Sequence, residues 1–289
     1  MTSNAPVMNL VAQGPEMTGA YAAELSRMAG CPFEALSATA YRYRVRTRDP
    51  KIARWCEARR IDHAFVSEGQ RFDRLKLVAM DMDSTLISIE CIDELGDMAG
   101  RRAEIAAITA QAMRGEIDYP ESLRRRVALL KGLQASALDR VYRERLKLTA
   151  GAEQLVAACK QSGARLLLVS GGFTFFTERL KSRLGLDYTI SNSLSIENGL
   201  LTGRLAGEIV DADAKAEKFL SVMKELGATR EQTVAIGDGA NDLKMMTQAG
   251  VSIAYRAKPA VRAQASCALN FSGLDGVLNL FEQVPGRAA

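Results

Sequence analysis

The sequence predicts an α/β protein with a Rossmann-like parallel sheet core, a helical cap inserted into that core, and a small α+β domain in front of it. From about residue 75 onward, short apolar segments end in Gly or Asp and are each followed by a helical pattern, which is typical of a buried parallel sheet. A helical stretch at about 87–147 separates the first two of these segments and predicts the cap. We therefore expect an N-terminal domain over residues 1–72 and a capped core over residues 73–289.

The composition is that of a globular protein with a sizeable core. Of 289 residues, 47% are apolar, and 38 basic residues nearly balance 34 acidic ones, for a net charge of +4. That balance argues against a dedicated nucleic-acid or membrane surface, while a small positive charge suits anionic substrates. We expect no targeting signal at the N-terminus and no membrane span, because neither pattern is visible.

The histidine and cysteine contents narrow the chemistry. His63 is the only histidine, so a metal site with two imidazole ligands is excluded. The five cysteines are odd in number and form no C-x-x-C pair, which predicts neither disulfides nor a zinc site and fits a reducing cytoplasm. Carboxylates must therefore carry the chemistry.

The N-terminal domain is predicted to alternate strands with helices. The expected elements are, in order, strand 7–12, helix 18–28, strand 41–45, helix 50–59 and strand 61–66. In the second strand, Arg42, Arg44 and Arg46 alternate with apolar residues, so we expect them to form a solvated face without chemistry.

The core strands are predicted from apolar runs that end in Gly, Asp or Ser. The expected strands are 77–81, 165–170, 233–237 and 251–254. Residues 189–210 contain Asn198-Gly199, a dipeptide that favours a tight turn, so a β-hairpin appended to the sheet is expected there. Parallel sheets place their ligand sites at the carboxyl ends of strands, and polar clusters follow several of these strands.

Two carboxylates stand where the first core strand reaches the surface. Asp83 follows Asp81 by two residues, so in an extended backbone both side chains point the same way while Met82 faces the core. This spacing suits a carboxylate nucleophile with a neighbouring proton donor, and therefore aspartate-based phosphoryl transfer. A polar strand end with a Ser/Thr/Asp turn is the structural alternative.

Three further groups complete a candidate phosphoryl site. Ser170-Gly171-Gly172 precedes a predicted helix, where a hydroxyl and free N–H groups suit a phosphate. A glycine-rich turn after the third strand carries Asp238, Asn241 and Asp242, whose hard oxygen atoms are the ligands that Mg²⁺ prefers. Lys215 by itself would be assigned to a surface salt bridge, but phosphoryl transfer needs a fixed cation, which makes it a candidate.

In order and spacing these residues resemble the signature of the haloacid dehalogenase-like phosphatases: D-x-D-x-[TV], then Ser/Thr, then Lys, then G-D-x-x-x-D. Within that superfamily the chain more closely resembles the phosphoserine phosphatase family, over roughly residues 75–285. The motifs that carry this resemblance are Asp81-Met82-Asp83-Ser84-Thr85-Leu86, Glu90, Ser122-Leu123-Arg124-Arg125-Arg126-Val127, Ser170-Gly171-Gly172-Phe173 and Gly237 to Asp242. The N-terminal domain is similar to the ACT-like regulatory domain that precedes some members.

The resemblance implies a role for each group. Asp81 would be the nucleophile that forms an aspartyl-phosphate, and Asp83 would protonate the leaving serine hydroxyl and then activate water. Mg²⁺ would be held by Asp81, the backbone carbonyl of Asp83 and Asp238, with support from Asp242. The phosphoryl group would contact Ser170, Gly171, Lys215 and Asn241.

The cap sequence independently favours Arg126 as the arginine aimed inward. At about 100° per residue, Arg126 lies roughly 60° from the centre of the apolar stripe of its helix, whereas Arg125 is nearly opposite. An inward arginine would clamp a substrate carboxylate, and Glu90 would accept the substrate ammonium group. A solvated basic helix face is the alternative, and it suits Arg125 better.

The expected function is Mg²⁺-dependent hydrolysis of O-phosphoserine in the cytoplasm, the last step of serine biosynthesis. An alternative enzyme would act on another small phosphorylated metabolite, or pass the phosphoryl group to another alcohol such as homoserine. A phospho-accepting receiver module is disfavoured, because the paired Asp81 and Asp83 supply a built-in hydrolytic acid and base. The expected partner is a small phosphorylated amino acid, with no nucleic acid or membrane, and a homodimer is left open.

Overall fold

The computed structural model of the chain describes residues 6–286. Within that range, contacts divide the chain into two units. The first unit comprises residues 6–78, 150–165 and 228–286, and the second comprises residues 79–149 and 166–227. Among the helices within the described range, none combines the length and the apolar character that a membrane crossing requires.

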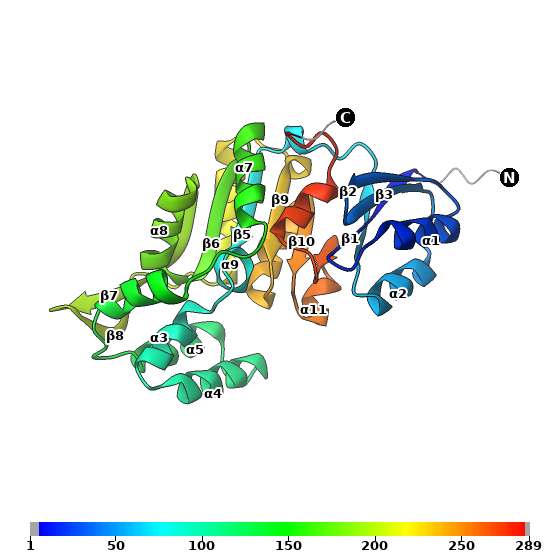
Figure 1. Cartoon of the computed structure of the whole chain (residues 1–289). Helices are drawn as coiled ribbons and strands as arrows, with labels where there is room; N and C mark the ends of the chain where they lie inside the picture. The colour runs from blue at the N-terminus through cyan, green and yellow to red at the C-terminus, as the bar shows by residue number, and fades with distance from the viewer. Residues whose placement is uncertain (1–5, 287–289) are drawn as a thin grey trace. The chain divides into compact units, whose positions relative to one another are not determined.

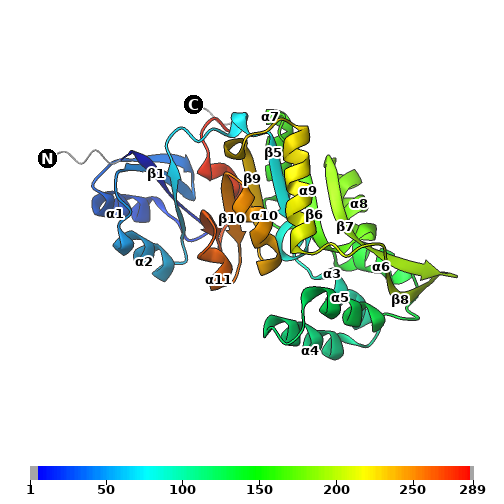
Figure 2. The same ribbon diagram turned by 180° about the vertical axis from the view of Figure 1, so that it is seen from behind.

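The N-terminal part of the first unit is a four-stranded antiparallel sheet with two helices on one face. Its elements are β1 (Met8–Gln13), α1 (Gly19–Ala29), β2 (Phe33–Ser37), β3 (Ala40–Val45), α2 (Pro50–Ala58) and β4 (Asp62–Ser67). The strand order is β2-β3-β1-β4, and α1 and α2 lie side by side (Figures 1 and 2). The prediction missed β2, because its mostly exposed residues lack the alternation of apolar and polar side chains that marks a half-buried strand.

Local sequence signals set the ends of these two helices. Thr18 caps α1 with its hydroxyl, and Gly30 ends that helix in the left-handed conformation, with φ 66°. Asp49 accepts the N–H of Lys51 at 2.8 Å, directly ahead of the proline that opens α2. The apolar faces of the helices then pack on β1 and β3 in one hydrophobic cluster.

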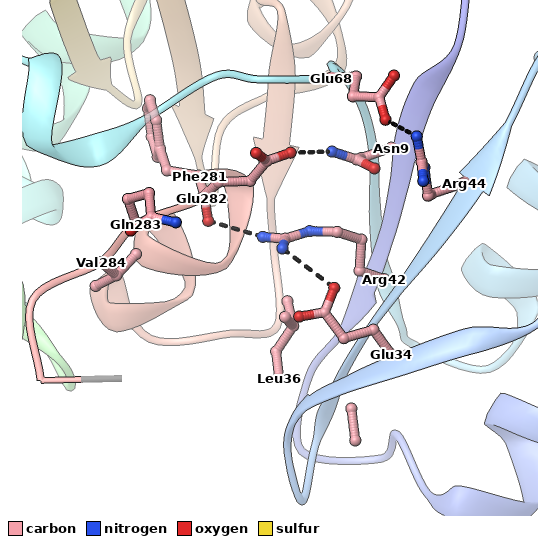
Figure 3. A pocket seen from close by; sticks show the side chains of 11 residues that line it. Asn9, Glu34, Leu36, Arg42, Arg44, Glu68, Phe281, Glu282, Gln283 and Val284 are labelled. Atoms are coloured by element: carbon pink, nitrogen blue, oxygen red, sulfur yellow. Dashed lines mark hydrogen bonds and ion pairs between the residues drawn. The ribbon is translucent and has the colours of Figure 1, made fainter. Parts of the chain in front are cut away.

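The N-terminal sheet is fastened to the C-terminal segment of the same unit. The buried carboxylate of Asp62 accepts three backbone N–H groups from residues 270–272 at 2.7–3.1 Å. Arg42 donates to the carbonyl of Phe281 at 2.7 Å and pairs with Glu34, beside a cavity of about 580 Å³ (Figure 3). The prediction of a solvated Arg42 is therefore wrong, because backbone from a distant part of the chain buries its guanidinium; the other two arginines are exposed as predicted.

The rest of the first unit supplies three parallel strands and their helices. The elements are α7 (Ala152–Ser162), β9 (Thr233–Gly237), α10 (Leu243–Gln248), β10 (Val251–Tyr255), α11 (Pro259–Arg262) and β11 (Cys267–Leu269). All residues of β9 and β10 are buried, as expected for strands covered on both faces. The short β11 was not predicted.

The second unit contains the predicted hairpin. Its elements outside the cap are β6 (Arg165–Phe173), α8 (Thr174–Leu184), β7 (Tyr188–Glu197), β8 (Leu200–Ala206) and α9 (Ala212–Glu225). β6 and β7 pair in parallel, and β7 and β8 pair antiparallel. The hairpin turn has positive φ angles at Asn198 (50°) and Gly199 (75°), which explains why this dipeptide predicted it correctly.

A helical segment lies between β5 (Leu77–Asp81) and β6 in the sequence. It contains α3 (Cys91–Met98), α4 (Arg102–Met113), α5 (Tyr119–Ala128) and α6 (Ser136–Arg140). The first three of these helices pack together, and α5 also packs on β8 (Figure 1). The strand order of the seven-stranded sheet is β11-β10-β9-β5-β6-β7-β8, so the fold is α/β with a mostly parallel sheet.

Candidate active site

A buried ion pair lies at the end of β5. Lys215 Nζ is 2.8 Å from Asp81 Oδ1, and the two side chains are 1% and 8% exposed. A lone charge buried to this extent would cost several kcal/mol, so each of the two stabilises the other. A carboxylate and a fixed cation that are so poorly hydrated are suited to reaction with an anionic group such as a phosphate.

The first turn of α9 positions Lys215. Asp211 caps this helix by accepting the N–H groups of Asp213 and Ala214 at 2.9 and 3.0 Å, and its carbonyl accepts the N–H of Lys215. Lys215 therefore shares the inward face of α9 with the buried Phe219. Sequence pattern alone favoured a surface salt bridge here; the pair is buried instead, because its acidic partner comes from a distant strand.

Asp83 lies in the turn that follows β5, and its two carboxylate oxygens have different partners. Oδ1 accepts the N–H of Cys91 at 2.8 Å, and Oδ2 accepts the hydroxyl of Ser170 at 3.4 Å. Met82 is fully buried, as predicted. β5 ends at Asp81, and Ser84 takes up the left-handed conformation with φ 55°, so the continuous strand assumed from the sequence does not extend to Asp83.

The two aspartates differ in their electrostatic environments. Burial raises the pKa of Asp83, against the opposing effects of the Cys91 N–H and the Lys215 charge. A raised pKa favours the protonated carboxyl, which is the form that can give a proton to a leaving group. Asp81 instead forms an ion pair with the Lys215 ammonium at 2.8 Å.

The end of β6 brings the candidate phosphate loop next to Asp83. This strand continues to Phe173, three residues beyond the predicted end at Ser170, so α8 begins after the two glycines and not at them. Ser170 Oγ accepts the N–H of Gly172 at 2.8 Å, and the same hydroxyl donates its proton to Asp83 Oδ2 at 3.4 Å. A Cβ at Gly172 would lie 2.6 Å from Asp83 Oδ2, so glycine is needed for this close approach.

Two side chains that the sequence did not single out hold the carbonyl of Gly171. Tyr119 donates its hydroxyl at 3.1 Å, and Asn192 donates its amide at 2.8 Å. Burial raises the pKa of Tyr119 to about 12, so its hydroxyl stays protonated at neutral pH. Tyr119 follows the helix cap Asp118, and Asn192 is a single amide within a strand; neither pattern by itself points to a site.

On the cap, α5 presents Arg126 and Arg125 differently. Arg126 is half-buried, whereas Arg125 is exposed and pairs with Glu121 at 2.7 Å. Burial raises the pKa values of Tyr119 and Asp93, and the charge of Arg126 opposes both shifts. Arg126 follows Tyr119 by seven residues, or about two turns, so both residues lie on one side of α5.

Glu90 is exposed at the start of α3, where it is the residue that precedes the first helical turn. Its Oε1 accepts the hydroxyl of Ser84 at 2.6 Å. This hydrogen bond links Glu90 to the turn that carries Asp83, so a carboxylate from the cap side is held near the candidate acid.

In the first unit, a glycine-rich turn follows β9. Asp242 is fully buried, and its Oδ2 accepts the N–H of Gly239 at 3.0 Å. A Cβ at Gly237 would lie 2.5 Å from the Asp242 side chain, so this position also needs glycine. Asp238 and Asn241 are half-buried in the same turn.

The acidic residues of these strand ends have the donor chemistry of a metal site. Asp81 ends β5 in the second unit, and Asp238 and Asp242 follow β9 in the first. They offer carboxylate oxygens and no nitrogen or sulfur, which is the donor chemistry that suits Mg²⁺ and disfavours zinc.

The chain resembles proteins of one family. Residues 78–247 match the haloacid dehalogenase-like hydrolases. A phosphoserine phosphatase from Polaromonas sp. is 58% identical over 210 residues, which cover 71% of this chain and 89% of that protein. The crystal structure of a probable phosphoserine phosphatase from Vibrio cholerae, in unliganded form, has a TM-score of 0.83 at 37% identity, over 94% of this chain and 85% of that one. A structure of a phospho-aspartyl intermediate analogue of phosphoserine phosphatase has a TM-score of 0.68 at 38% identity, over 72% of this chain and 99% of that one.

These similarities cover the residues that form the site. The matched region takes in more than half of the chain, from β5 with Asp81 to the turn after β9. The Polaromonas protein is covered over most of its own length, so the similarity is to a whole protein. The chain belongs to the haloacid dehalogenase-like hydrolases and, within them, to the phosphoserine phosphatase family.

Proposed function

We propose that this chain hydrolyses O-phosphoserine to serine and phosphate, with Mg²⁺, through an aspartyl-phosphate intermediate. The observation that carries the proposal is the buried Asp81–Lys215 pair beside Asp83, a carboxyl whose pKa is raised by burial. The names of the relatives support the substrate, and the phospho-aspartyl analogue of a 38% identical protein supports the intermediate.

In the first step, a carboxylate oxygen of Asp81 attacks the phosphorus of the substrate. A new O–P bond forms on Asp81 while the bond between phosphorus and the serine oxygen breaks. Asp83 gives its proton to the departing serine oxygen, which its raised pKa favours.

In the second step, water replaces Asp81 on the phosphorus. Asp83, now ionised, takes a proton from that water as its oxygen attacks. The O–P bond to Asp81 breaks, so phosphate leaves and the carboxylate is restored. These two steps replace a direct attack of water on the phosphate monoester, and that direct attack would be slower.

Four residues are proposed to hold the phosphoryl group. Lys215 offsets the charge on the phosphoryl oxygens from a fixed position, since its ammonium is buried and paired with Asp81. The hydroxyl of Ser170, whose oxygen accepts the Gly172 N–H, would turn its proton from the 3.4 Å contact with Asp83 to a phosphoryl oxygen. Gly171 and Asn241 complete the set with a backbone N–H and a side-chain amide.

The cap residues are proposed to recognise the amino-acid end of the substrate. Arg126 would bind the carboxylate, and its half-buried position on the side of α5 that carries Tyr119 supports this role. Glu90 would bind the ammonium group; it is exposed and accepts the Ser84 hydroxyl, which holds its carboxylate near Asp83. A phosphate monoester that lacks these two groups would then be a poorer substrate.

Mg²⁺ is proposed to be held by Asp81, the backbone carbonyl of Asp83 and Asp238, with Asp242 in support. The hard oxygen donors of this set support the assignment. When bound, Mg²⁺ neutralises part of the charge on the phosphoryl oxygens and on the attacking carboxylate.

Further proposals concern organisation and location. We propose an ACT-like N-terminal domain over residues 1–72, a core over 73–289 and a cap at about 87–147; the β1-α1-β2-β3-α2-β4 order supports the first of these. The five free cysteines support a reducing cytoplasmic location. A homodimer stays a prediction, which light scattering after size-exclusion chromatography would test.

The test is a phosphate-release screen of the purified full chain over phosphorylated metabolites, with Mg²⁺ and with EDTA. We expect O-phosphoserine to give the highest kcat/KM, and EDTA to abolish turnover. Adding homoserine as an acceptor would reveal a phosphotransferase as phosphohomoserine formed at the expense of free phosphate. Turnover that is indifferent to EDTA, or a clear preference for a metabolite without an amino-acid end, would overturn the proposal.

A further inference from the structure

Asn192 is a buried amide whose two ends bind different parts of the candidate site. It lies on β7 and is 1% exposed. Its Nδ2 donates to the carbonyl of Gly171 at 2.8 Å, and its Oδ1 accepts the N–H of Val210 at 2.8 Å. Since donor and acceptor are both in use, the amide bridges the end of β6 and the segment that leads into α9.

At the first end, the amide fixes one peptide plane of the phosphate loop. The carbonyl of Gly171 and the N–H of Gly172 belong to the same peptide group and point in opposite directions. Asn192 and Tyr119 hold the carbonyl side, and Ser170 Oγ accepts the N–H side at 2.8 Å. The orientation of this plane therefore sets the direction in which Ser170 can donate its proton.

At the second end, the amide fixes the start of α9. Val210 directly precedes Asp211, the residue that caps this helix, and Lys215 lies one turn further on. Holding the Val210 backbone therefore limits where the cap and the first turn can sit. Lys215 depends on that placement, because its 2.8 Å contact with Asp81 is made from this turn.

We propose that Asn192 is a positioning residue for the phosphoryl site. It holds the Gly171 carbonyl together with Tyr119 and ties it to the start of α9, which fixes the spacing between the Ser170 hydroxyl and the Lys215 ammonium. This inference rests on the proposed function, in which both groups hold one phosphoryl group. Asn192 does not itself contact the reacting atoms.

A purely structural role for Asn192 predicts a loss of stability without a change in phosphate binding. The neighbouring residue on β7, Ser191, provides the control. Ser191 also uses its side chain to fasten this strand, through a 2.7 Å hydrogen bond to Thr177 on α8. That contact does not involve the phosphate loop or the start of α9. Ser191→Ala therefore weakens the packing of the same strand without touching the proposed network.

The experiment compares Asn192→Leu, Ser191→Ala and the unaltered full chain in the presence of Mg²⁺. It measures kcat and KM for O-phosphoserine, the inhibition constant of inorganic phosphate, and the melting temperature. For Asn192→Leu we expect kcat/KM to fall by about ten- to a hundredfold, as for the loss of a buried hydrogen-bonded group, and the phosphate inhibition constant to rise by about tenfold. Ser191→Ala should lower the melting temperature and leave the inhibition constant within about twofold.

The outcomes separate this inference from the proposed function. If the unaltered chain released no phosphate from O-phosphoserine, the proposed function would fail first. If it did, and Asn192→Leu matched Ser191→Ala in its phosphate inhibition constant, the positioning role would be overturned while the function stood. Should Asn192→Leu not fold, Tyr119→Phe becomes the deciding variant, since it removes the other donor to the Gly171 carbonyl and keeps the ring. An unchanged phosphate inhibition constant in Tyr119→Phe would equally overturn the inference.

Discussion

Replacing Lys215 with Met should destabilise the protein strongly, even before activity is considered. The change removes the ammonium and keeps a side chain of similar length, so the Asp81 carboxylate, whose side chain is 8% exposed, loses its partner. Removing one partner of a buried ion pair costs about 3 to 5 kcal/mol, because the remaining charge stays poorly hydrated. At about 2 to 4 °C per kcal/mol for a chain of this size, the melting temperature should fall by about 6 to 20 °C.

The assay is thermal and urea unfolding followed by circular dichroism, in EDTA so that no metal ion compensates the charge. Lys224→Met is the matched control, because it makes the same change at an exposed position in the last turn of the same helix. We expect the control to lose less than about 1 kcal/mol. The double variant Lys215→Met with Asp81→Asn removes both charges and should recover at least half of the loss, since no lone carboxylate remains.

Two results would refute this reasoning. If Lys215→Met were as stable as Lys224→Met, the ammonium would not be a buried counter-charge, and the argument for a fixed cation at the phosphoryl site would fail. If the double variant were less stable than Lys215→Met alone, the two side chains would act independently, contrary to the 2.8 Å contact between them.

The remaining predictions concern activity, specificity and the N-terminal segment. Asp81→Asn should lose several orders of magnitude in Mg²⁺-dependent turnover with an unchanged circular dichroism spectrum, and substantial residual activity in folded protein would exclude Asp81 as the nucleophile. Arg126→Ala should lower kcat/KM for O-phosphoserine about ten- to a hundredfold, or about 1.5 to 3 kcal/mol, but affect p-nitrophenyl phosphate far less; equal losses would argue against a carboxylate clamp. Deleting residues 1–72 should leave phosphate release measurable but lower the melting temperature, and a folded truncation without activity would show that this segment completes the site. Asp62→Ala in the full chain should lower the free energy of unfolding by about 2 to 4 kcal/mol, since three N–H groups lose their acceptor. A loss within about 0.5 kcal/mol in urea unfolding would mean that water replaces the carboxylate there.

Much of the fold and of the candidate site could be predicted because the signals are local. Apolar runs bounded by Gly or Asp predict buried strands, and Asn198-Gly199 predicts its hairpin turn from backbone preference alone. The candidate groups lie at the ends of such runs, as Asp81 does at the end of β5, and parallel strands place their ends at one edge of a sheet. Strands without such a pattern, as in the exposed β2, were missed for the same reason.

What only the tertiary structure decided is the environment of each polar side chain. By its sequence context Lys215 fits a surface salt bridge and Arg42 a solvated strand face, yet both are buried against partners far away in the chain. Asn192 carries no sequence signal, although it joins two segments of the site. The physical reason is that burial, ion pairing and hydrogen bonding depend on which distant atoms come within a few ångströms, and no local periodicity records those distances. The sequence by itself determined which chemical groups stand at the strand ends, and the folded chain determined which of them are dehydrated, paired and held in place.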